Sequence, residues 1–218
     1  MTAKVAICIP SGKDWSAHTA MSLIDLSIFS TVQGVGIKTI CKQCSIISMS
    51  RNMHVREALA FEPAATHVMW VDSDMKFIPQ ALVRLLAHDK DIVGAFYNRR
   101  VPPYDTVGHL IGQPDISKGG LFAADVMPGG FVLMKRHVYE KIDPPWYFES
   151  YDKELATPHD PDGTVGEDIG FSKKAIAAGF EIWCDADLSF SMGHVGEIVV
   201  PCLPPGVRPV TAPEGVPQ

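Results

Sequence analysis

The sequence lacks the features that mark membrane and secreted proteins. It has no apolar run close to the ~20 residues that a transmembrane helix needs, and residues 1–5 do not have the layout of a signal peptide. Its five cysteines, an odd number, do not indicate a disulfide framework. The Cys-x-x-Cys at Cys41–Cys44 has no second pair, so a zinc or redox site is not expected. We therefore expect a cytoplasmic protein without a membrane partner.

The chain also has no excess of positive charge. Its 19 Lys and Arg residues against 25 Asp and Glu residues give a formal net charge of -6, which provides no general attraction to nucleic acid. A local basic patch at Asn98-Arg99-Arg100 stays open. With 46% hydrophobic and 20% charged residues in a chain of 218, the composition is typical of one globular domain. We predict that domain over 1–200, followed by a Pro/Gly-rich tail at 201–218.

Strand-like segments alternate with helical ones through the first hundred residues. Such alternation favours a parallel sheet with right-handed crossovers. We predict an α/β fold: a single Rossmann-like domain with a mostly parallel central sheet flanked by helices. The predicted strands lie at 4–9, within 36–47, at 67–71 and at 91–96, and the predicted helices at 15–32, at 50–61 with Ser50 as N-cap, and at 79–88.

The second half of the chain is less regular. Residues 97–125 and 143–166 are rich in Gly, Pro and Asp and are expected to be irregular segments that cover a site. Trp146-Tyr147-Phe148 would either stack on a sugar or base ring or cover the core. A strand is predicted at 126–135, where Gly129-Gly130 suggests close approach by a ligand or another backbone. The remaining predictions are helices at 136–142 and 167–178 and a strand region at 180–190.

Two carboxylates come directly after the third predicted strand, His67–Val71. Asp72 and Asp74 are two residues apart, so in an extended turn they point to the same side. They lie at the edge where open α/β sheets bind ligands. Two like charges this close need a proton or a cation between them, and a hard divalent cation that carries a diphosphate would suit them. The alternative is an acidic loop that caps the next helix.

Two other features could join this pair, and a third is a rival to it. Glu167-Asp168 opens a helix, whose N-terminus would keep Asp168 ionised as a base, unless both acids serve only as helix caps. His194, flanked by glycines after the last strand region, is either a metal ligand or an ordinary loop histidine. Asp185 and Asp187 form a second Asp-x-Asp and a rival metal site, although the residues after Asp187 read as strand rather than helix.

The order of these features resembles a GT-A-fold glycosyltransferase, most similar to the family 2 type, in the compact soluble form found in bacteriophage genomes. The resemblance covers residues 4 to 196. The Asp-x-Asp is unspecific alone, whereas the ordered set with an acid pair just before a helix is more specific. The segments that carry it are Pro10-Ser11-Gly12, Ser50-Arg51-Asn52, Val71-Asp72-Ser73-Asp74, Gly129-Gly130, Gly166-Glu167-Asp168 and the late His194.

The resemblance implies a role for each matching residue. The cofactor would be Mn²⁺ or Mg²⁺, and the donor a nucleotide-sugar, with a UDP-sugar favoured. The sugar would pass to an acceptor hydroxyl with inversion. The implied roles are metal ligation by Asp72, Asp74 and His194, with Asp72 also near the ribose; base catalysis by Asp168 with Glu167 beside it; nucleotide contacts by Pro10, Ser11 and Arg51; and lining of the donor sugar and acceptor by Gly129 and Gly130.

Several alternatives stay open. The acceptor could be a saccharide, a small molecule or a modified DNA base of a phage, in which case the enzyme would work in the host cytoplasm. No carboxylate after the second strand is placed to read uracil, and Gln43 is the nearest substitute. The chain also lacks the long C-terminal regions that many family members use for lipid or polymer acceptors. The other candidates are a nucleotidyltransferase acting on a sugar phosphate and a non-catalytic protein that binds sugar nucleotides.

Overall fold

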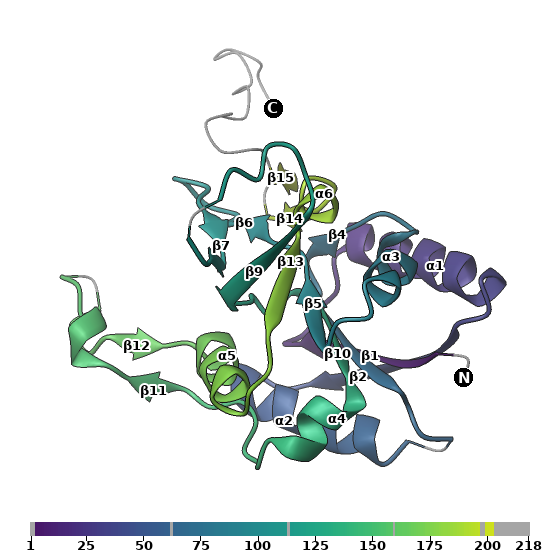
Figure 1. Ribbon diagram of the computed structural model, residues 1–218, viewed down its shortest axis with the longest axis horizontal. Coiled ribbons are helices and arrows are strands. Elements are labelled where there is room, and N and C mark those ends of the chain that lie inside the picture. The colour runs from purple at the N-terminus through teal and green to yellow at the C-terminus, as the bar shows by residue number, and fades with distance from the viewer. Residues whose placement is uncertain (1–2, 62, 113, 159, 197–198, 203–218) are drawn as a thin grey trace.

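A computed structural model describes residues 3–61, 63–112, 114–158, 160–196 and 199–202 (Figure 1). Its centre is an eight-stranded sheet with the strand order β2-β1-β3-β10-β5-β13-β9-β8. β9 and β10 run opposite to the other six strands. The sheet strands are β1 (Lys4–Ser11), β2 (Gly36–Gln43), β3 (His67–Val71), β5 (Ile92–Gly94), β8 (His109–Leu110), β9 (Leu121–Val126), β10 (Phe131–Lys135) and β13 (Ile182–Asp185).

Helices cover both faces of this sheet (Figure 1). Alternation along β1 explains why, since Ala6 and Cys8 enter one core cluster while Val5, Ile7 and Ile9 enter the other. The first cluster is closed by α2, α4 and α5, and the second by α1 and α3. The helices are α1 (Ala17–Val32), α2 (Ile47–Leu59), α3 (Ala81–Ala87), α4 (Arg136–Lys141), α5 (Glu167–Ala177) and α6 (Ala186–Ser189). The predicted α/β fold with a mostly parallel, helix-flanked sheet is confirmed.

Short strands build the rim above the carboxyl ends of the main strands. One small sheet has the order β15-β14-β4, and β6 pairs with β7. These elements are β4 (Met75–Lys76), β14 (Gly193–Val195), β15 (Val199–Pro201), β6 (Tyr97–Asn98) and β7 (Thr106–Val107). None of the described helices is both long and apolar enough to cross a bilayer. Of the predicted tail, 203–218 lies outside the described residues.

Three predictions in the second half of the chain are wrong. The strand expected at 126–135 begins only at Phe131, as β10, because β9 ends at Val126 and Pro128, in the turn between them, has no amide hydrogen to continue a ladder. Residues 97–125 are not wholly irregular, since they include β9. The strand region at 180–190 ends at Asp185, where the aspartate side chain accepts a hydrogen bond from the Leu188 amide and caps α6.

The long segment at 143–166 forms an arm that projects from the body (Figure 1). It contains β11 (Ser150–Tyr151), a 3₁₀ turn (Lys153–Leu155) and β12 (Thr164–Val165). At its base Trp146 and Tyr147 are buried in the core, which favours the core-covering role over ring stacking. In the first half, α2 begins at Ile47, so Ser50 is not its N-cap. Nothing in 47–49 breaks the helix, and the carbonyl of the buried Ser50 accepts a bond from the His54 ring inside it.

Candidate active site

The backbone of Asp72-Ser73-Asp74 is fixed by three distant segments. The amide of its first residue donates to the Gly130 carbonyl at 3.0 Å. The carbonyl of its middle residue accepts bonds from the Ser16 amide and the Thr19 hydroxyl, both at 2.9 Å. The carbonyl of its last residue accepts from the Val195 amide at 2.7 Å. The two aspartates therefore stand on a rigid turn at the carboxyl end of β3.

Arg51, on α2, joins this turn to the start of α5. Its Nη2 donates to Asp72 Oδ1 at 3.0 Å, its Nε to Glu167 Oε1 at 2.9 Å and its Nη1 to the Gly129 carbonyl at 3.2 Å. The residue is 2% exposed. Burial would lower the pKa of Arg51, but the charges of Asp72 and Glu167 outweigh it and raise that pKa, so the guanidinium stays charged. Planar, charge-assisted bonds of this kind orient both carboxylates.

His194 is brought to Asp74 by strand pairing. Since β4 comes after the turn and pairs antiparallel with β14, His194 lies opposite Met75. Its Nδ1 donates to the Asn98 carbonyl at 2.9 Å, and its Nε2 lies 3.4 Å from Asp74 Oδ2. Burial lowers the pKa of His194, but the Asp74 carboxylate and the Asn98 carbonyl outweigh it and raise that pKa. With Nδ1 as the donor, the neutral ring presents the Nε2 lone pair toward Asp74.

Arg100 is the second cation on Asp74. Its Nη1 donates to Asp74 Oδ2 at 2.5 Å, and its side chain is 53% exposed. Burial would raise the pKa of Asp74, but His194 and then Arg100 outweigh it and hold that pKa below its ordinary value. The pKa of Asp72, in contrast, is raised. Burial is the largest cause, and repulsion from Asp74 and Glu167 adds to it, whereas the charge of Arg51 acts in the opposite direction. The two aspartates of one motif therefore differ in electrostatic setting.

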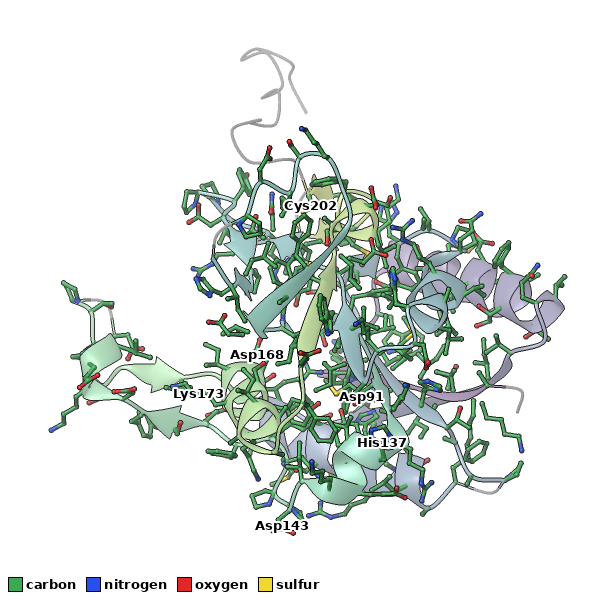
Figure 2. All side chains as sticks on the ribbon, viewed as in Figure 1. Asp91, His137, Asp143, Asp168, Lys173 and Cys202 are labelled. Carbon is green, nitrogen blue, oxygen red and sulfur yellow. The ribbon has the colours of Figure 1, made fainter. Side chains whose placement is uncertain are left out.

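Asp168 is the acid at this edge that pairs with no cation among the described residues. It is the second residue of α5 and lies between that helix and β9 (Figure 2). Its Oδ1 accepts from the Ile169 amide at 2.8 Å, and within the described part of the chain no Lys, Arg or His forms an ion pair with it. Burial, and next the charge of Glu167, raises the pKa of Asp168. A carboxylate with a raised pKa is a better proton acceptor.

The glycine pair makes room for the protein's own side chains. A methyl group at Gly129 would lie 2.5 Å from Arg51 Nη2, and one at Gly130 would overlap the Tyr97 hydroxyl. The Gly130 amide donates to that hydroxyl at 3.0 Å. Burial raises the pKa of Tyr97, and the charges of Asp72 and Asp168 raise it further, so Tyr97 stays a neutral phenol near both acids. The close approach at Gly129-Gly130 is thus made by Arg51 and Tyr97.

Pro10 and Ser11 lie at the same edge of the sheet. They end β1, whose register with β3 pairs Cys8 with Trp70, so they stand beside the residues that come after β3. Ser11 is buried, and its carbonyl accepts from the Cys44 amide at 3.0 Å. The structure therefore brings every predicted site residue to one edge.

The second Asp-x-Asp is occupied by other side chains. Arg84 donates through Nε and Nη2 to Asp185 and through Nη2 to Asp187, and His88 Nε2 lies 2.7 Å from Asp185. Asp185 is 0% exposed. The Gly120 amide donates to Asp187 at 3.1 Å. The Asp187 side chain is 50% exposed, but both carboxylates already have cationic partners, so this pair is not the metal site that we favour.

The donors at Asp74 fit a divalent cation that also binds phosphate. Among the described residues, no group of three or more His, Cys, Asp or Glu side chains could hold a metal alone. Atoms that ligate one cation at about 2.1 Å lie roughly 3.0–3.4 Å apart. The 3.4 Å between His194 Nε2 and Asp74 Oδ2 matches that spacing. Magnesium-type ions often take one or two carboxylates and complete their shell with phosphate and water.

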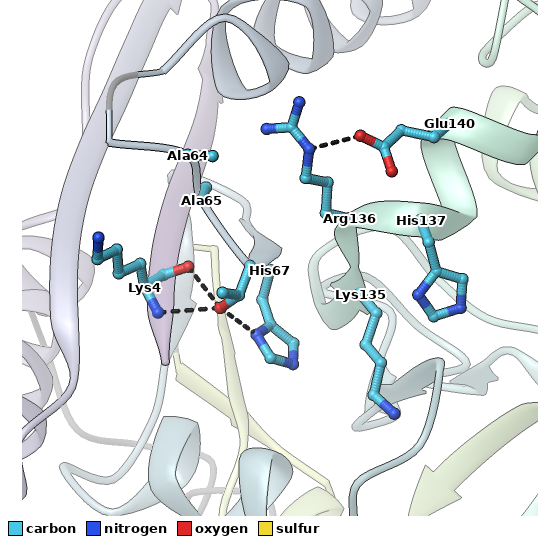
Figure 3. Close-up of a pocket in the computed structure, with 9 residues that line it drawn as sticks. Lys4, Ala64, Ala65, His67, Lys135, Arg136, His137 and Glu140 are labelled. Atoms are coloured by element: carbon cyan, nitrogen blue, oxygen red, sulfur yellow. Dashed lines mark hydrogen bonds and ion pairs between the residues drawn. The ribbon is translucent and has the colours of Figure 1, made fainter. Parts of the chain in front are cut away.

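A separate cavity of about 710 Å³ lies at the opposite edge of the sheet. It is lined by the start of β1 at Lys4, by the start of β3 at His67 and by the end of β10 with Lys135 and Arg136 (Figure 3). None of the predicted site residues lines it. Its basic side chains are largely neutralised, since Arg136 pairs with Glu140 and Lys135 with aspartates outside the cavity.

Sequence reasoning missed three residues of this site. Tyr97 bonds the Gly130 amide, the Asn98 carbonyl orients His194, and Arg100 binds Asp74. A signal was present, because these residues come directly after the strand predicted at 91–96 and so belong to the same carboxyl edge as Asp72.

Comparison with solved structures identifies the fold. The viral protein A197 from STIV matches with a TM-score of 0.57 and 14% identity, over 95% of this chain and 98% of its own. The catalytic domain of Drosophila β1,4-galactosyltransferase 7 in complex with xylobiose matches with a TM-score of 0.54 and 13% identity, over 89% of this chain and 71% of its own. A mutant of that enzyme in complex with manganese, UDP-Gal and xylobiose matches with a TM-score of 0.51, 12% identity and the same coverage.

Identities this low establish the fold and nothing finer. The chain has the GT-A fold seen in glycosyltransferases, as the resemblance predicted. No family model matches the sequence, and no curated protein matches it either.

Proposed function

We propose that the chain is a metal-dependent glycosyltransferase that moves a sugar from a nucleotide-sugar donor to an acceptor hydroxyl with inversion. The observation that carries this proposal is that the acids have different partners. Asp74 lies beside His194, Arg51 donates to both Asp72 and Glu167, and Asp168 pairs with no cation among the described residues. A metal ligand and a base are the two functions that such a transfer requires of side chains.

Asp74 and His194 would hold Mn²⁺ or Mg²⁺. The bound cation would supply charge neutralisation for the departing diphosphate. Asp72 accepts a hydrogen bond from Arg51. Because Arg51 is only 2% exposed, its side chain is fixed, and it fixes the Asp72 carboxylate in turn. Asp72 would orient the ribose or assist the metal, and Pro10 and Ser11 would lie against the nucleotide.

Asp168 would accept the proton of the acceptor hydroxyl as that oxygen attacks the anomeric carbon. Attack from the side opposite the diphosphate inverts the anomeric centre. The raised pKa of Asp168 favours this role, because proton transfer is most efficient when the pKa of the base approaches the working pH. Glu167 keeps Arg51 in place and would act through position rather than by contact with the substrate.

One solved neighbour bears on the classes of donor and acceptor. A structural neighbour binds manganese, UDP-Gal and xylobiose, which supports a UDP-sugar donor and a saccharide acceptor. A modified DNA base is the less favoured acceptor, because the net charge of -6 gives no attraction to a polyanion.

Mass spectrometry of products from a mixed pool of nucleotide-sugars and acceptors, with Mn²⁺, tests this proposal. We expect a sugar adduct with the wild type and none with Asp168→Asn, while UDP binding by calorimetry stays unchanged. Asp162→Asn, an exposed acid on the arm, is the matched control and should react like the wild type. Wild-type turnover by Asp168→Asn would remove Asp168 as the base.

A nucleotide panel in a thermal-shift assay separates the alternatives. Metal-dependent stabilisation by a nucleoside diphosphate agrees with the transferase. Stabilisation by a nucleoside triphosphate alone would instead favour a nucleotidyltransferase, and product-free binding of sugar nucleotides a non-catalytic protein.

A further inference from the structure

The two arginines at the Asp-x-Asp turn differ in how they are held. Arg51 is 2% exposed and makes three hydrogen bonds to two acids and a carbonyl. The Arg100 side chain is 53% exposed, and its described polar contact is with Asp74. The guanidinium of Arg51 is therefore part of the core, whereas that of Arg100 reaches Asp74 from the solvent side and can leave it without opening the core.

The backbone of Arg100 is nevertheless fixed beside the site. The two preceding residues are both anchored: the Asn98 carbonyl accepts from His194 Nδ1, and the Arg99 amide donates to the Asp105 carbonyl at 2.8 Å. A methyl group at Gly196 would lie 3.2 Å from Arg100 Cβ, so the two segments are packed closely. Arg100 can thus change its side-chain direction while its backbone stays next to Asp74 and His194.

Arg100 and a metal ion cannot share Asp74. The Arg100 guanidinium donates to Asp74 Oδ2, which is also the oxygen that lies 3.4 Å from His194 Nε2. A divalent cation bound between that oxygen and that nitrogen would occupy the place of the guanidinium and repel its charge. Metal binding therefore requires that Arg100 leave Asp74.

We propose that Arg100 is an exchangeable counter-ion: it neutralises Asp74 when no metal is bound and moves to the donor diphosphate when the metal takes Asp74. This inference rests on the proposed function and adds a specific coupling to it. A guanidinium fork suits phosphate oxygens, and a diphosphate held by the metal would be the nearest anion for a displaced Arg100.

The exchange makes metal and nucleotide binding cooperative. The metal alone must displace Arg100 without compensation, so it binds weakly. With the diphosphate present, Arg100 gains a new partner and the metal binds more tightly, and by linkage the metal strengthens nucleotide binding equally. Removal of the guanidinium should therefore improve binding of the metal alone and weaken the coupling.

Calorimetric titration of Mn²⁺, with and without UDP, tests this exchange in the full chain. We expect Arg100→Ala to bind Mn²⁺ alone about five- to tenfold more tightly than the wild type, and the enhancement by UDP to fall about tenfold. Arg99→Ala removes the adjacent exposed arginine, for which the structure describes no ion pair, and should match the wild type in both titrations. Thermal melts of each variant establish that it is folded.

Two results would overturn the inference. One is that Arg100→Ala binds Mn²⁺ alone no more tightly than the wild type, and the other is that the enhancement by UDP is unchanged. Asp74→Ala separates these results from failure of the metal site. If Asp74→Ala keeps wild-type Mn²⁺ affinity, the metal site is wrong and the exchange falls with it. If Asp74→Ala loses affinity while Arg100→Ala behaves as the wild type, the exchange alone is wrong.

Discussion

Two of the chain's Asp-x-Asp pairs, Asp72/Asp74 and Asp185/Asp187, come at the carboxyl end of a sheet strand, and their carboxylates have different partners. In Asp185-Ala186-Asp187, Arg84 bridges both acids, Asp185 is 0% exposed and the Asp187 side chain is 50% exposed. Asp72-Ser73-Asp74 is split, since Arg51 holds the first acid and the exposed Arg100 meets the second.

The surroundings of the second acid make the difference. After Asp185 a helix begins at once, and Asp187 is bound by Arg84 and by the Gly120 amide. After Asp74 the chain enters β4, which pairs with β14 and brings His194 beside the acid. The spacing of two acids is therefore no evidence for a metal site, whereas the partner of the second acid is informative: Asp74 lies beside a histidine and Asp187 beside an arginine.

Loss of the arginine from each pair should have the largest effect. Arg51→Met leaves Asp72 and Glu167 without a buried counter-ion and should cost about 3–5 kcal/mol of unfolding free energy. Arg84→Met should cost about 1–2 kcal/mol, because Arg84 is 39% exposed and His88 still pairs with Asp185. Urea denaturation at pH 7 measures both values. Equal losses of unfolding free energy would mean that the two arginines stabilise their acid pairs equally.

Metal binding should separate the second acids. Asp74→Ala should lower Mn²⁺ affinity about hundredfold, or roughly 2.7 kcal/mol, since it removes a direct ligand. Asp187→Ala should leave that affinity unchanged, because its carboxylate is already bound by Arg84 and the Gly120 amide. Calorimetry with Mn²⁺ and UDP gives both affinities. A lower Mn²⁺ affinity in the Asp187 variant would show that the Asp185/Asp187 pair also contributes to ligand binding.

The glycines packed beside each pair, Gly119 near Asp187 and Gly196 near Arg100, offer a third contrast. An alanine at Gly119 would overlap the Asp187 carboxylate, and the φ of +71° there is unfavourable for any side chain, so Gly119→Ala should cost about 2 kcal/mol. Gly196→Ala meets Arg100 Cβ at 3.2 Å in ordinary backbone geometry and should cost less than about 1 kcal/mol. Thermal melts compare the two variants. A larger loss of stability in Gly196→Ala would show that packing is tighter beside Asp74 than beside Asp187.

Acidification should affect the first acids in opposite directions. Burial raises the pKa of Asp72, so the wild type should gain stability over Asp72→Asn as the pH falls through that raised pKa toward the ordinary value. The pKa of Asp185 is lowered, since Arg84 and His88 outweigh burial. Its stabilisation is full above about pH 4 and is lost as the pH falls through the lowered pKa.

Urea titrations between pH 3 and pH 7 of the wild type and the two Asn variants would detect the direction of each change. Parallel behaviour of Asp72→Asn and Asp185→Asn would contradict the difference in electrostatic setting. The Asn variants keep the shape and an acceptor oxygen, so packing is an internal control.

Local sequence signals were enough for the first half of the fold. The strand at 67–71 and the helices near 15–32 and 79–88 depend on hydrophobic period and on Gly and Pro breakers, which act over a few residues. The second half was harder, because Pro128 divides an apolar run whose two parts join different neighbours: β9 pairs with β13, and β10 with β3 and β5.

The candidate site was predicted from the order of motifs that resembles a family, not from contacts between residues. Arg51 and Glu167 are separated by 116 positions, so no local pattern indicates their bond. His194 reaches Asp74 through a two-residue strand, β4, which is too short to show a period. Side-chain partners such as Arg100 depend on tertiary approach, and neither hydropathy nor propensity records it.

The position of β10 between β3 and β5 bears on how the protein is made. As the chain leaves the ribosome, residues up to Gly94 can build β2-β1-β3, but the free edge of β3 has no neighbour until residues 131–135 arrive. That exposed edge is open to pairing with other chains during synthesis. The strand that closes it also delivers Gly129 and Gly130 to Arg51 and Tyr97. Closure of the β3 edge and placement of Gly129 and Gly130 beside Arg51 and Tyr97 would therefore occur together, before β13 and His194 have been made.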